Sequence, residues 1–251
     1  MAMAAGAAFA DTEIASANIV GYQSFAIEAN KWYLLGAQFE KVTGGAIDIQ
    51  DFVKSEDLAP GHSENDSNCP QLLKYDGVGY VPYVYADEND MGDTFDPPQW
   101  LDSNSGDPAA DIEIAAGESV WFFAKEDANI SVAGQVADGS AKTVTIEPNK
   151  WNLIANPFPV AFAINGDKFD CSGLTAVVGE NNEDAPQLLA YDGAGYIPYV
   201  YCSENDMGDE FDPPQWLDNG GDPTEAEISA GAGFWMYFKN TLDPVVIEFV
   251  K

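Results

Sequence analysis

Acidic side chains gathered in one short segment, which occurs twice, are the residues of this chain best suited to chemistry. Residues 88–96 hold five carboxylate or amide side chains, and residues 204–212 repeat them 116 positions further on. Calcium in proteins takes about six to eight oxygen ligands from carboxylates, amide oxygens and backbone carbonyls on a bent loop. The pattern therefore predicts a Ca²⁺ site in each copy, with ligands Glu88, Asn89, Asp90, Asp93 and Asp96 in the first and Glu204, Asn205, Asp206, Asp209 and Asp212 in the second.

The acidity of the whole chain gives these segments a second interpretation. There are 42 Asp and Glu residues against 10 Lys and no Arg, and the formal net charge is −32. An acidic loop can then be an ordinary solvated surface adapted to salt, and Met91 stands where an EF-hand loop supplies an oxygen ligand. The charge also argues against nucleic acid and anionic membranes as partners, because phosphate recognition relies on Lys and Arg. Cations suit this field better.

Catalytic patterns are scarce. His62 is the single histidine, and neither a G-x-S-x-G elbow nor a C-x-x-C pair is present. A retaining glycosidase needs two carboxyl groups about 5–5.5 Å apart, but among 42 acids such a pair arises by chance. We therefore expect that the protein is not an enzyme.

Aromatic residues near the acidic segments offer a different chemistry, the stacking of sugar rings. Tyr and Trp have an apolar body with a polar tip, which suits recognition surfaces. Alternation along a strand places the two tyrosines of each copy on one face of the sheet. The alternative to sugar binding is that this face packs on an opposing sheet as part of the core. The candidate ligand-binding residues are Tyr83, Tyr85, Trp100, Tyr199, Tyr201 and Trp216.

An internal repeat determines the organisation that must position these residues. The segment Pro70–Asp102 returns as Pro186–Asp218 with 27 identities in 33 positions, so one structural unit is used twice. We predict an all-β protein of two tandem homologous domains, each sandwich-like or a partly open barrel, at residues 11–136 and 137–251.

Aromatic and branched residues between turn signals predict the strands. An Asp-Gly turn at Asp76–Gly79 predicts a hairpin, and Asp192–Gly195 repeats it. One or two helical turns are expected at 48–55, and the paired prolines Pro97 and Pro98 predict an exposed crossover instead of a strand. Strands are expected at residues 18–27, 32–39, 72–75, 80–85, 119–124 and 130–136, and at 143–146, 151–154, 233–239 and 245–250.

The chain begins with a small-residue apolar run at residues 1–10 that ends Ala8-Phe9-Ala10. This is typical of the end of a signal peptide and predicts export, and the alternative is an alanine-rich disordered tail. No apolar run of a length that spans a membrane is present. Of the three cysteines, Cys171 and Cys202 lie in the same copy and are the most plausible disulfide.

Three short motifs occur in the same order in both copies. They are an Asn-Lys-Trp strand start, an Asp-Gly-x-Gly-Tyr hairpin and a Gly turn into an aromatic strand, at Asn30–Trp32, Asp76–Tyr80 and Gly117–Phe123, and at Asn149–Trp151, Asp192–Tyr196 and Gly231–Tyr237. This order resembles uncharacterised secreted bacterial proteins built of tandem β modules. The resemblance implies secretion and a β-fold, and it implies no activity.

Together these features predict a secreted or cell-surface structural protein. We expect it to form homo-oligomers, as filaments or a lattice, with Ca²⁺ at the acidic loops, because two near-identical modules present two similar surfaces. The alternative is a carbohydrate-binding protein in which duplicated aromatic surfaces raise the avidity for a polysaccharide.

Overall fold

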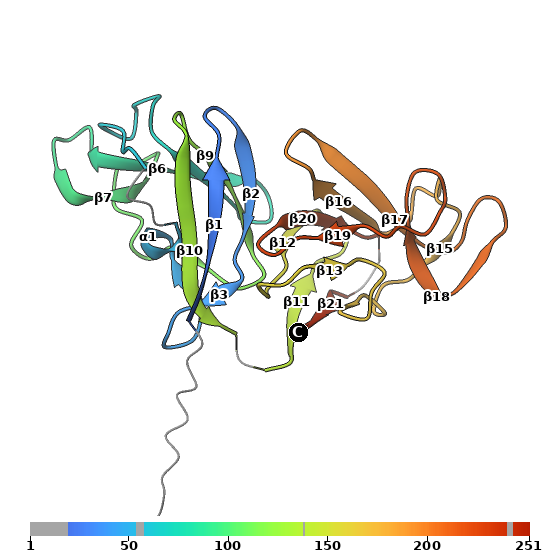
Figure 1. Ribbon diagram of the computed structural model, residues 1–251. Coiled ribbons are helices and arrows are strands. Elements are labelled where there is room, and N and C mark those ends of the chain that lie inside the picture. Colours follow the sequence, from blue (N-terminus) through green and yellow to red (C-terminus); the bar gives the residue numbers. More distant parts are fainter. Residues whose placement is uncertain (1–19, 54–57, 138, 240–242) are drawn as a thin grey trace, which may run out of the picture.

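The computed structural model describes residues 20–53, 58–137, 139–239 and 243–251, so the apolar segment at residues 1–10 lies outside the described residues. Two units lie side by side (Figure 1). Within the described ranges the one helix is the short α1 (Ile49–Phe52), and the remaining regular elements are β-strands that form open sheets. The all-β prediction is confirmed. No helix in these ranges is long and apolar enough to cross a membrane.

The first unit contains ten strands in three antiparallel sheets. They are β1 (Val20–Ile27), β2 (Trp32–Gly36), β3 (Phe39–Glu40), β4 (Ile47–Asp48), β5 (Gln71–Tyr75), β6 (Tyr80–Glu88), β7 (Thr94–Asp102), β8 (Glu113–Ile114), β9 (Ser119–Phe123) and β10 (Ala128–Val136). The main sheet has the order β2-β9-β5-β6-β7, and the other two are β1-β10-β3 and β4-β8. The predicted hairpin is therefore formed, by β5 and β6.

The second unit repeats this plan. Its strands are β11 (Ala141–Ile146), β12 (Asn152–Ala155), β13 (Phe162–Ala163), β14 (Phe169–Asp170), β15 (Val177–Val178), β16 (Gln187–Tyr191), β17 (Tyr196–Glu204), β18 (Glu210–Leu217), β19 (Glu227–Ile228), β20 (Gly233–Tyr237) and β21 (Val245–Val250). The main sheet has the order β12-β20-β16-β17-β15, with β18 also paired to β17, and the smaller sheets are β11-β21-β14 and β13-β19.

The main sheet of each unit has two apolar faces, because side chains alternate along every strand. In the first unit Leu72 and Phe122 are 0% exposed and belong to the core, which lies between this sheet and β1-β10. Their strand neighbours Leu73 and Trp121 point to the opposite face and belong to a separate cluster that contains residues of both units. Each unit has its own core, and the two core clusters divide at Val136 and Ala137.

The smaller sheets differ between the units for a reason visible in the sequence. Phe39 lies in β3 and pairs with β10, whereas its counterpart Phe158 is flanked by Pro157 and Pro159. Proline cannot donate to a ladder, so no strand forms at this position. In the second unit β14, from a later part of the chain, occupies the third place beside β21.

The paired prolines lie in a strand, which corrects the predicted crossover. Pro97 and Pro98 fall within β7, which is the edge strand of its sheet. The pairing with β6 shifts register between Ala86 and Glu88, so the prolines pass the irregular part of the ladder. An edge position with a bulge is where a sheet accepts residues that have no N–H to donate.

The predicted disulfide is also absent from the structure, where the three cysteines are free and buried. The Cys171 Sγ accepts a hydrogen bond from the Trp216 Nε1–H at 3.3 Å. Burial raises the pKa of the Cys171 thiol to about 12 and that of the Cys202 thiol to about 11. Each thiol behaves as a small apolar side chain in the core.

Candidate binding site at the junction of the two units

The first acidic segment forms a tight turn between β6 and β7 that is organised by a buried amide. Asn89 is 2% exposed. Its Oδ1 accepts the backbone N–H groups of Met91 at 3.1 Å and Asp93 at 2.9 Å. Its Nδ2 donates to the Asp93 carboxylate at 3.2 Å and to the Gly106 carbonyl at 3.5 Å. The amide oxygen expected to bind calcium is therefore occupied by the turn itself.

The second copy forms the same turn with the same contacts. Asn205 is also 2% exposed, and its Oδ1 accepts the N–H groups of Met207 at 3.1 Å and Asp209 at 2.9 Å. Its Nδ2 donates to the Asp209 carboxylate and the Gly221 carbonyl, each at 3.1 Å. The duplicated Asn thus has a structural role that explains its recurrence.

A glutamate from a preceding loop holds each turn from outside, and sequence reasoning missed it. The Asp90 N–H donates to Glu64 at 2.8 Å, and the Asp206 N–H donates to Glu180 at 2.7 Å. The adjacent amide Asn65 donates to the Asp90 carboxylate. Hydrogen bonds from Ser63 and Asn65 lower the pKa of Asp90. The signal was available, because the Glu-Asn pair at 64–65 recurs at 180–181, again 116 positions on.

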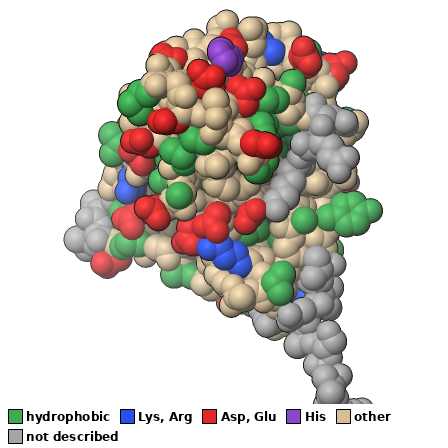
Figure 2. Space-filling model, turned by 90° about the vertical axis from the view of Figure 1, so that its left-hand side faces the viewer, with side chains coloured by type: hydrophobic (Ala, Val, Ile, Leu, Met, Phe, Trp, Pro, Cys, Tyr) green, Lys and Arg blue, Asp and Glu red, His purple; other side chains and the backbone are tan. Residues whose placement is uncertain are grey.

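The other predicted metal ligands are dispersed around the turns. Asp96 and Asp212 are exposed on the edge strands, while the partly exposed Glu88 lies 4.0 Å from the His62 ring. Among the residues the structure describes, no three His, Cys, Asp or Glu side chains are grouped so that they could hold a metal ion. Figure 2 shows acidic side chains distributed over the end of the molecule that the first unit forms. Calcium at these turns stays a prediction.

The predicted aromatic ligand-binding row is buried. Trp100 and Trp216 are each 1% exposed, Tyr83 is 3%, Tyr199 is 7% and Tyr201 is 8%. Tyr85 is partly exposed and packs against the core, its ring centroid 5.3 Å from that of Trp100. These rings pack between the sheets, as the alternative interpretation expects. Tyr201 and Trp216 also border a cavity of about 190 Å³ in the second unit, and sugar binding by the predicted residues stays a prediction.

A second set of aromatic residues, on the other face of the main sheets, meets at the junction of the two units. The backbone contacts there occur in equivalent pairs. The Gly36 N–H donates to the Gly231 carbonyl at 2.8 Å, and the Ala155 N–H donates to the Gly117 carbonyl at 2.7 Å. Exchanging the two units converts each of these hydrogen bonds into the other, so an approximate twofold axis relates the units.

Small residues allow this close approach. A Cβ on Gly36 would lie 2.6 Å from the Ala155 Cβ, and one on Gly233 would lie 2.2 Å from the Ser119 Oγ. Gly117 has a φ of 95°, a backbone conformation that favours glycine. The Gly turns that the sequence repeats are therefore the places where the backbones of the two units come into contact.

Two indole rings lie at the centre of the junction, and each contacts a tyrosine of the other unit. The Trp121 centroid is 4.9 Å from that of Tyr191, and the Trp235 centroid is 5.0 Å from that of Tyr75. Within each unit the indole N–H donates to a phenol oxygen, Trp121 to Tyr80 at 3.0 Å and Trp235 to Tyr196 at 3.2 Å. Both indoles are 8% exposed. The rings meet edge to face, the favourable geometry for aromatic pairs.

Two open pockets flank these indoles and are equivalent under the approximate twofold axis. Their volumes are about 340 and 330 Å³. The first is lined by Tyr75, Tyr80, Trp151, Leu189, Tyr196 and Trp235. The second is lined by the counterparts of these residues, Tyr191, Tyr196, Trp32, Leu73, Tyr80 and Trp121. Every lining position has the same residue type in both pockets, and Tyr80 and Tyr196 belong to both.

Burial acts on the phenols of two pocket tyrosines, Tyr80 and Tyr191. Burial raises the pKa of Tyr80, although the hydrogen bond from Trp121 opposes that shift. Burial likewise raises the pKa of Tyr191, with the neighbouring Tyr196 and Asp192 adding to the effect. No charged side chain lines either pocket. The pockets can hold a ligand against π-systems, and no Asp, Glu, His, Lys or Cys lines them.

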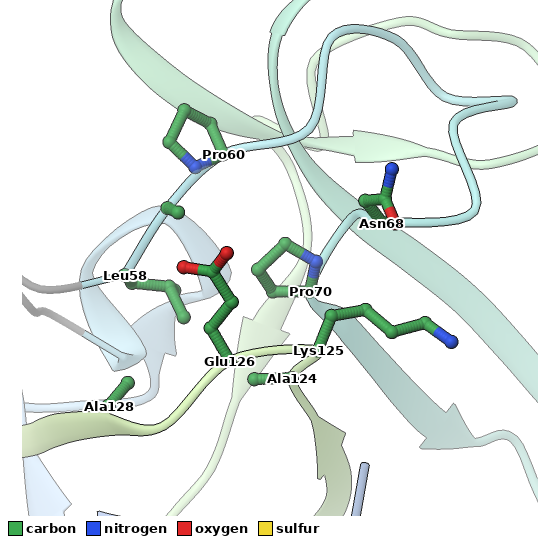
Figure 3. A pocket seen from close by; sticks show the side chains of 9 residues that line it. Leu58, Pro60, Asn68, Pro70, Ala124, Lys125, Glu126 and Ala128 are labelled. Carbon is green, nitrogen blue, oxygen red and sulfur yellow. The ribbon is translucent and has the colours of Figure 1, made fainter. Parts of the chain in front are cut away.

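Three other cavities lack this duplication. The largest of them, about 340 Å³, also lies between the two units and is bordered by Gly77, Glu118, Thr145 and Lys150. One of about 290 Å³ lies in the first unit between the loop at Leu58–Pro60 and the segment Ala124–Ala128, where Lys125 and Glu126 border it (Figure 3). Another of about 190 Å³ lies in the second unit over Cys171 and Tyr201. None of the three is found at the matching place of the other unit among the cavities described. The junction pockets are therefore the candidate site.

Comparison with protein-family models, with curated proteins and with solved structures finds no match to this chain.

Proposed function

We propose that this protein is a non-catalytic binding protein of the cell exterior, whose ligands dock in the two aromatic pockets at the junction of its units. The observation that carries the proposal is the preservation of all six lining positions in both pockets through the duplication. Packing alone requires apolar residues of suitable volume there, since cores tolerate swaps that keep volume. The repeated choice of Tyr and Trp at solvent-accessible positions favours recognition.

The exposure of the pocket tyrosines supports the same conclusion. Tyr80 is 43% and Tyr196 is 45% exposed, although each contacts the indole of the opposite unit at a centroid distance of 6.4 to 6.5 Å. Open aromatic clefts with few polar groups are typical of ligand sites. The lack of charged lining residues favours binding over catalysis, because proton transfer and nucleophilic attack both need a suitably placed reactive group.

A direct test is a fragment screen by saturation-transfer NMR on the intact protein. Compounds that bind the wild type should lose their signal with the Tyr80→Ala/Tyr196→Ala variant, which opens both pockets. Tyr22→Ala is the matched control, because Tyr22 is 77% exposed and lines neither pocket. Hits unaffected by the double variant, or no hits at all, would remove the basis for the proposal. A melting curve of each variant establishes that it is folded.

Calcium-supported assembly is a second candidate, favoured by the acidic turns that recur in both units. The junction uses the same surface of both units and is closed within the chain, so filaments or lattices would have to form through other surfaces. Particle size by light scattering, with millimolar calcium and then with a chelator, tests this candidate. A size that does not depend on calcium would count against it.

A further inference from the structure

We infer that the two pockets bind small quaternary ammonium cations of the choline type, one in each pocket. This inference rests on the proposed function and names its ligand class. Five of the six residues that line each pocket are aromatic. A cation within about 6 Å of a ring centroid is attracted to the negative face of the π-system, and aromatic cages recognise quaternary ammonium groups in this way.

The absence of hydrogen-bonding side chains other than phenol and indole distinguishes this ligand class from sugars. No Asp, Glu, Asn, Gln, Ser, Thr, Lys or His lines either pocket. The oxygens of Tyr80 and Tyr196 already accept the indole N–H groups. A bound sugar, or a primary ammonium, has more hydrogen-bonding groups than the few phenols of a pocket can satisfy, so its binding there costs hydrogen bonds to water. A trimethylammonium group has methyl groups where those ligands have donors.

The charge of the protein favours a cation of this kind. With a net charge of −32 and no arginine, the surrounding field attracts cations and repels anions. Lys31 and Lys150 directly precede the pocket residues Trp32 and Trp151, but neither lysine lines a pocket. Lys31 is also paired with Glu28 at 2.5 Å. A ligand that carries its own anionic group next to the ammonium should therefore bind less well than choline.

The shared tyrosines couple the two pockets. Tyr80 and Tyr196 each line both, so one substitution alters both sites at once. Trp32 and Trp151, by contrast, each line one pocket and lie at its outer edge, partly exposed. Trp32→Ala should therefore remove one site and leave the other intact, so this variant tests whether there are two sites per chain.

The experiment is a titration of the full chain with choline and tetramethylammonium, followed by tryptophan fluorescence and by calorimetry. We expect two sites per chain, one remaining in Trp32→Ala, and affinity at least tenfold weaker in Tyr80→Ala/Tyr196→Ala, with Tyr22→Ala unchanged. The uncharged isostere 3,3-dimethylbutanol should bind at least tenfold more weakly than choline. A higher salt concentration should weaken the binding of choline and leave the binding of the uncharged isostere unchanged.

Further ligands in the titration distinguish free choline from other molecules that carry a trimethylammonium group. They also distinguish failure of this inference from failure of the proposed function. Choline should bind better than glycine betaine or phosphatidylcholine vesicles, and a trimethyl-lysine peptide that bound far better than choline would overturn the small-cation assignment. Equal binding of choline and the isostere, or binding of cellobiose in the pockets without choline, would overturn the quaternary ammonium inference and leave the proposed function standing. If no probe binds and the pocket variants change nothing, both fail.

Discussion

Replacing the buried asparagine of the first acidic turn should destabilise the protein far more than its position in a surface turn suggests. In Asn89→Ala, the N–H groups of Met91 and Asp93 lose their shared acceptor, and the Gly106 carbonyl loses a donor. The bond to the Asp93 carboxylate is also lost. Asn89→Asp keeps the acceptor but places a second carboxylate beside that of Asp93, so it should also destabilise the turn.

The magnitude follows from these contacts. Three to four hydrogen bonds at about 1 kcal/mol each give a loss of about 3–4 kcal/mol in the free energy of unfolding, with the N–H groups left buried adding to the upper end. The bond at 3.5 Å to Gly106 contributes least. For a chain of 251 residues that unfolds cooperatively as a whole, the change corresponds to a fall in Tm of roughly 6–16 °C.

The assay is thermal and urea unfolding, with the second unit as an internal comparison. Asn205→Ala removes the same set of bonds, with the contact to the Gly221 carbonyl shorter at 3.1 Å, so its effect should be equal or larger. Met91→Ala is the control in the same turn, because Met91 is 68% exposed. We expect it to change stability by less than about 0.5 kcal/mol.

A loss below about 1 kcal/mol for both asparagine variants would refute the reasoning, since it would mean that the turn does not depend on the amide. The same variants also bear on calcium. If the wild type loses several degrees of Tm in a chelator while Asn89→Ala loses none, the turn binds metal through the amide oxygen, and the structural role argued here is wrong.

Three further predictions concern the charge, the thiols and the junction. Raising NaCl from about 0.05 to 0.5 M should raise Tm by screening the repulsion within a chain of net charge −32, and a constant or falling Tm would contradict this. The buried thiols of Cys69, Cys171 and Cys202 should resist a thiol reagent at pH 8 until denaturant is added. Their pKa values are raised from 9.0 to about 11 or 12, so the stability they contribute should be complete below pH 9 and lost as the pH rises through 11 to 12, as unfolding at increasing pH would reveal. Gly36→Ala should lower stability by about 1–3 kcal/mol through the clash with Ala155, whereas Gly79→Ala, which meets nothing within 4 Å, should change it far less in the same urea titration.

Local patterns were sufficient where local physics decides the structure. The Asp-Gly turn at Asp76 forms the expected hairpin because its carboxylate accepts the N–H groups of Val78 and Gly79, at 2.8 and 2.7 Å. Such contacts involve residues that are neighbours in the chain. The turn at Asn89 also depends on near neighbours, but its Glu64 contact joins residues 26 apart, and only the recurrence of the Glu-Asn pair 116 positions further on indicates it.

The choice of aromatic residues shows the limit. Tyr80 and Tyr83 lie on the same strand, and alternation puts them on opposite faces of the sheet. The sequence does not reveal which face becomes core. Tyr83 is 3% exposed inside the first unit, whereas Tyr80 is 43% exposed at the junction, so the candidate site lies on the face opposite to Tyr83.

The sequence by itself determined the β class, the duplication, the hairpins and the large excess of acidic over basic side chains, because each depends on residue type or on spacing along the chain. Only the tertiary structure decided that the Gly turns of the two units meet, and that Trp121 and Trp235 lie between them beside twin pockets. Burial and the approach of two backbones are properties of surfaces brought together in space. No single segment of the chain contains that information.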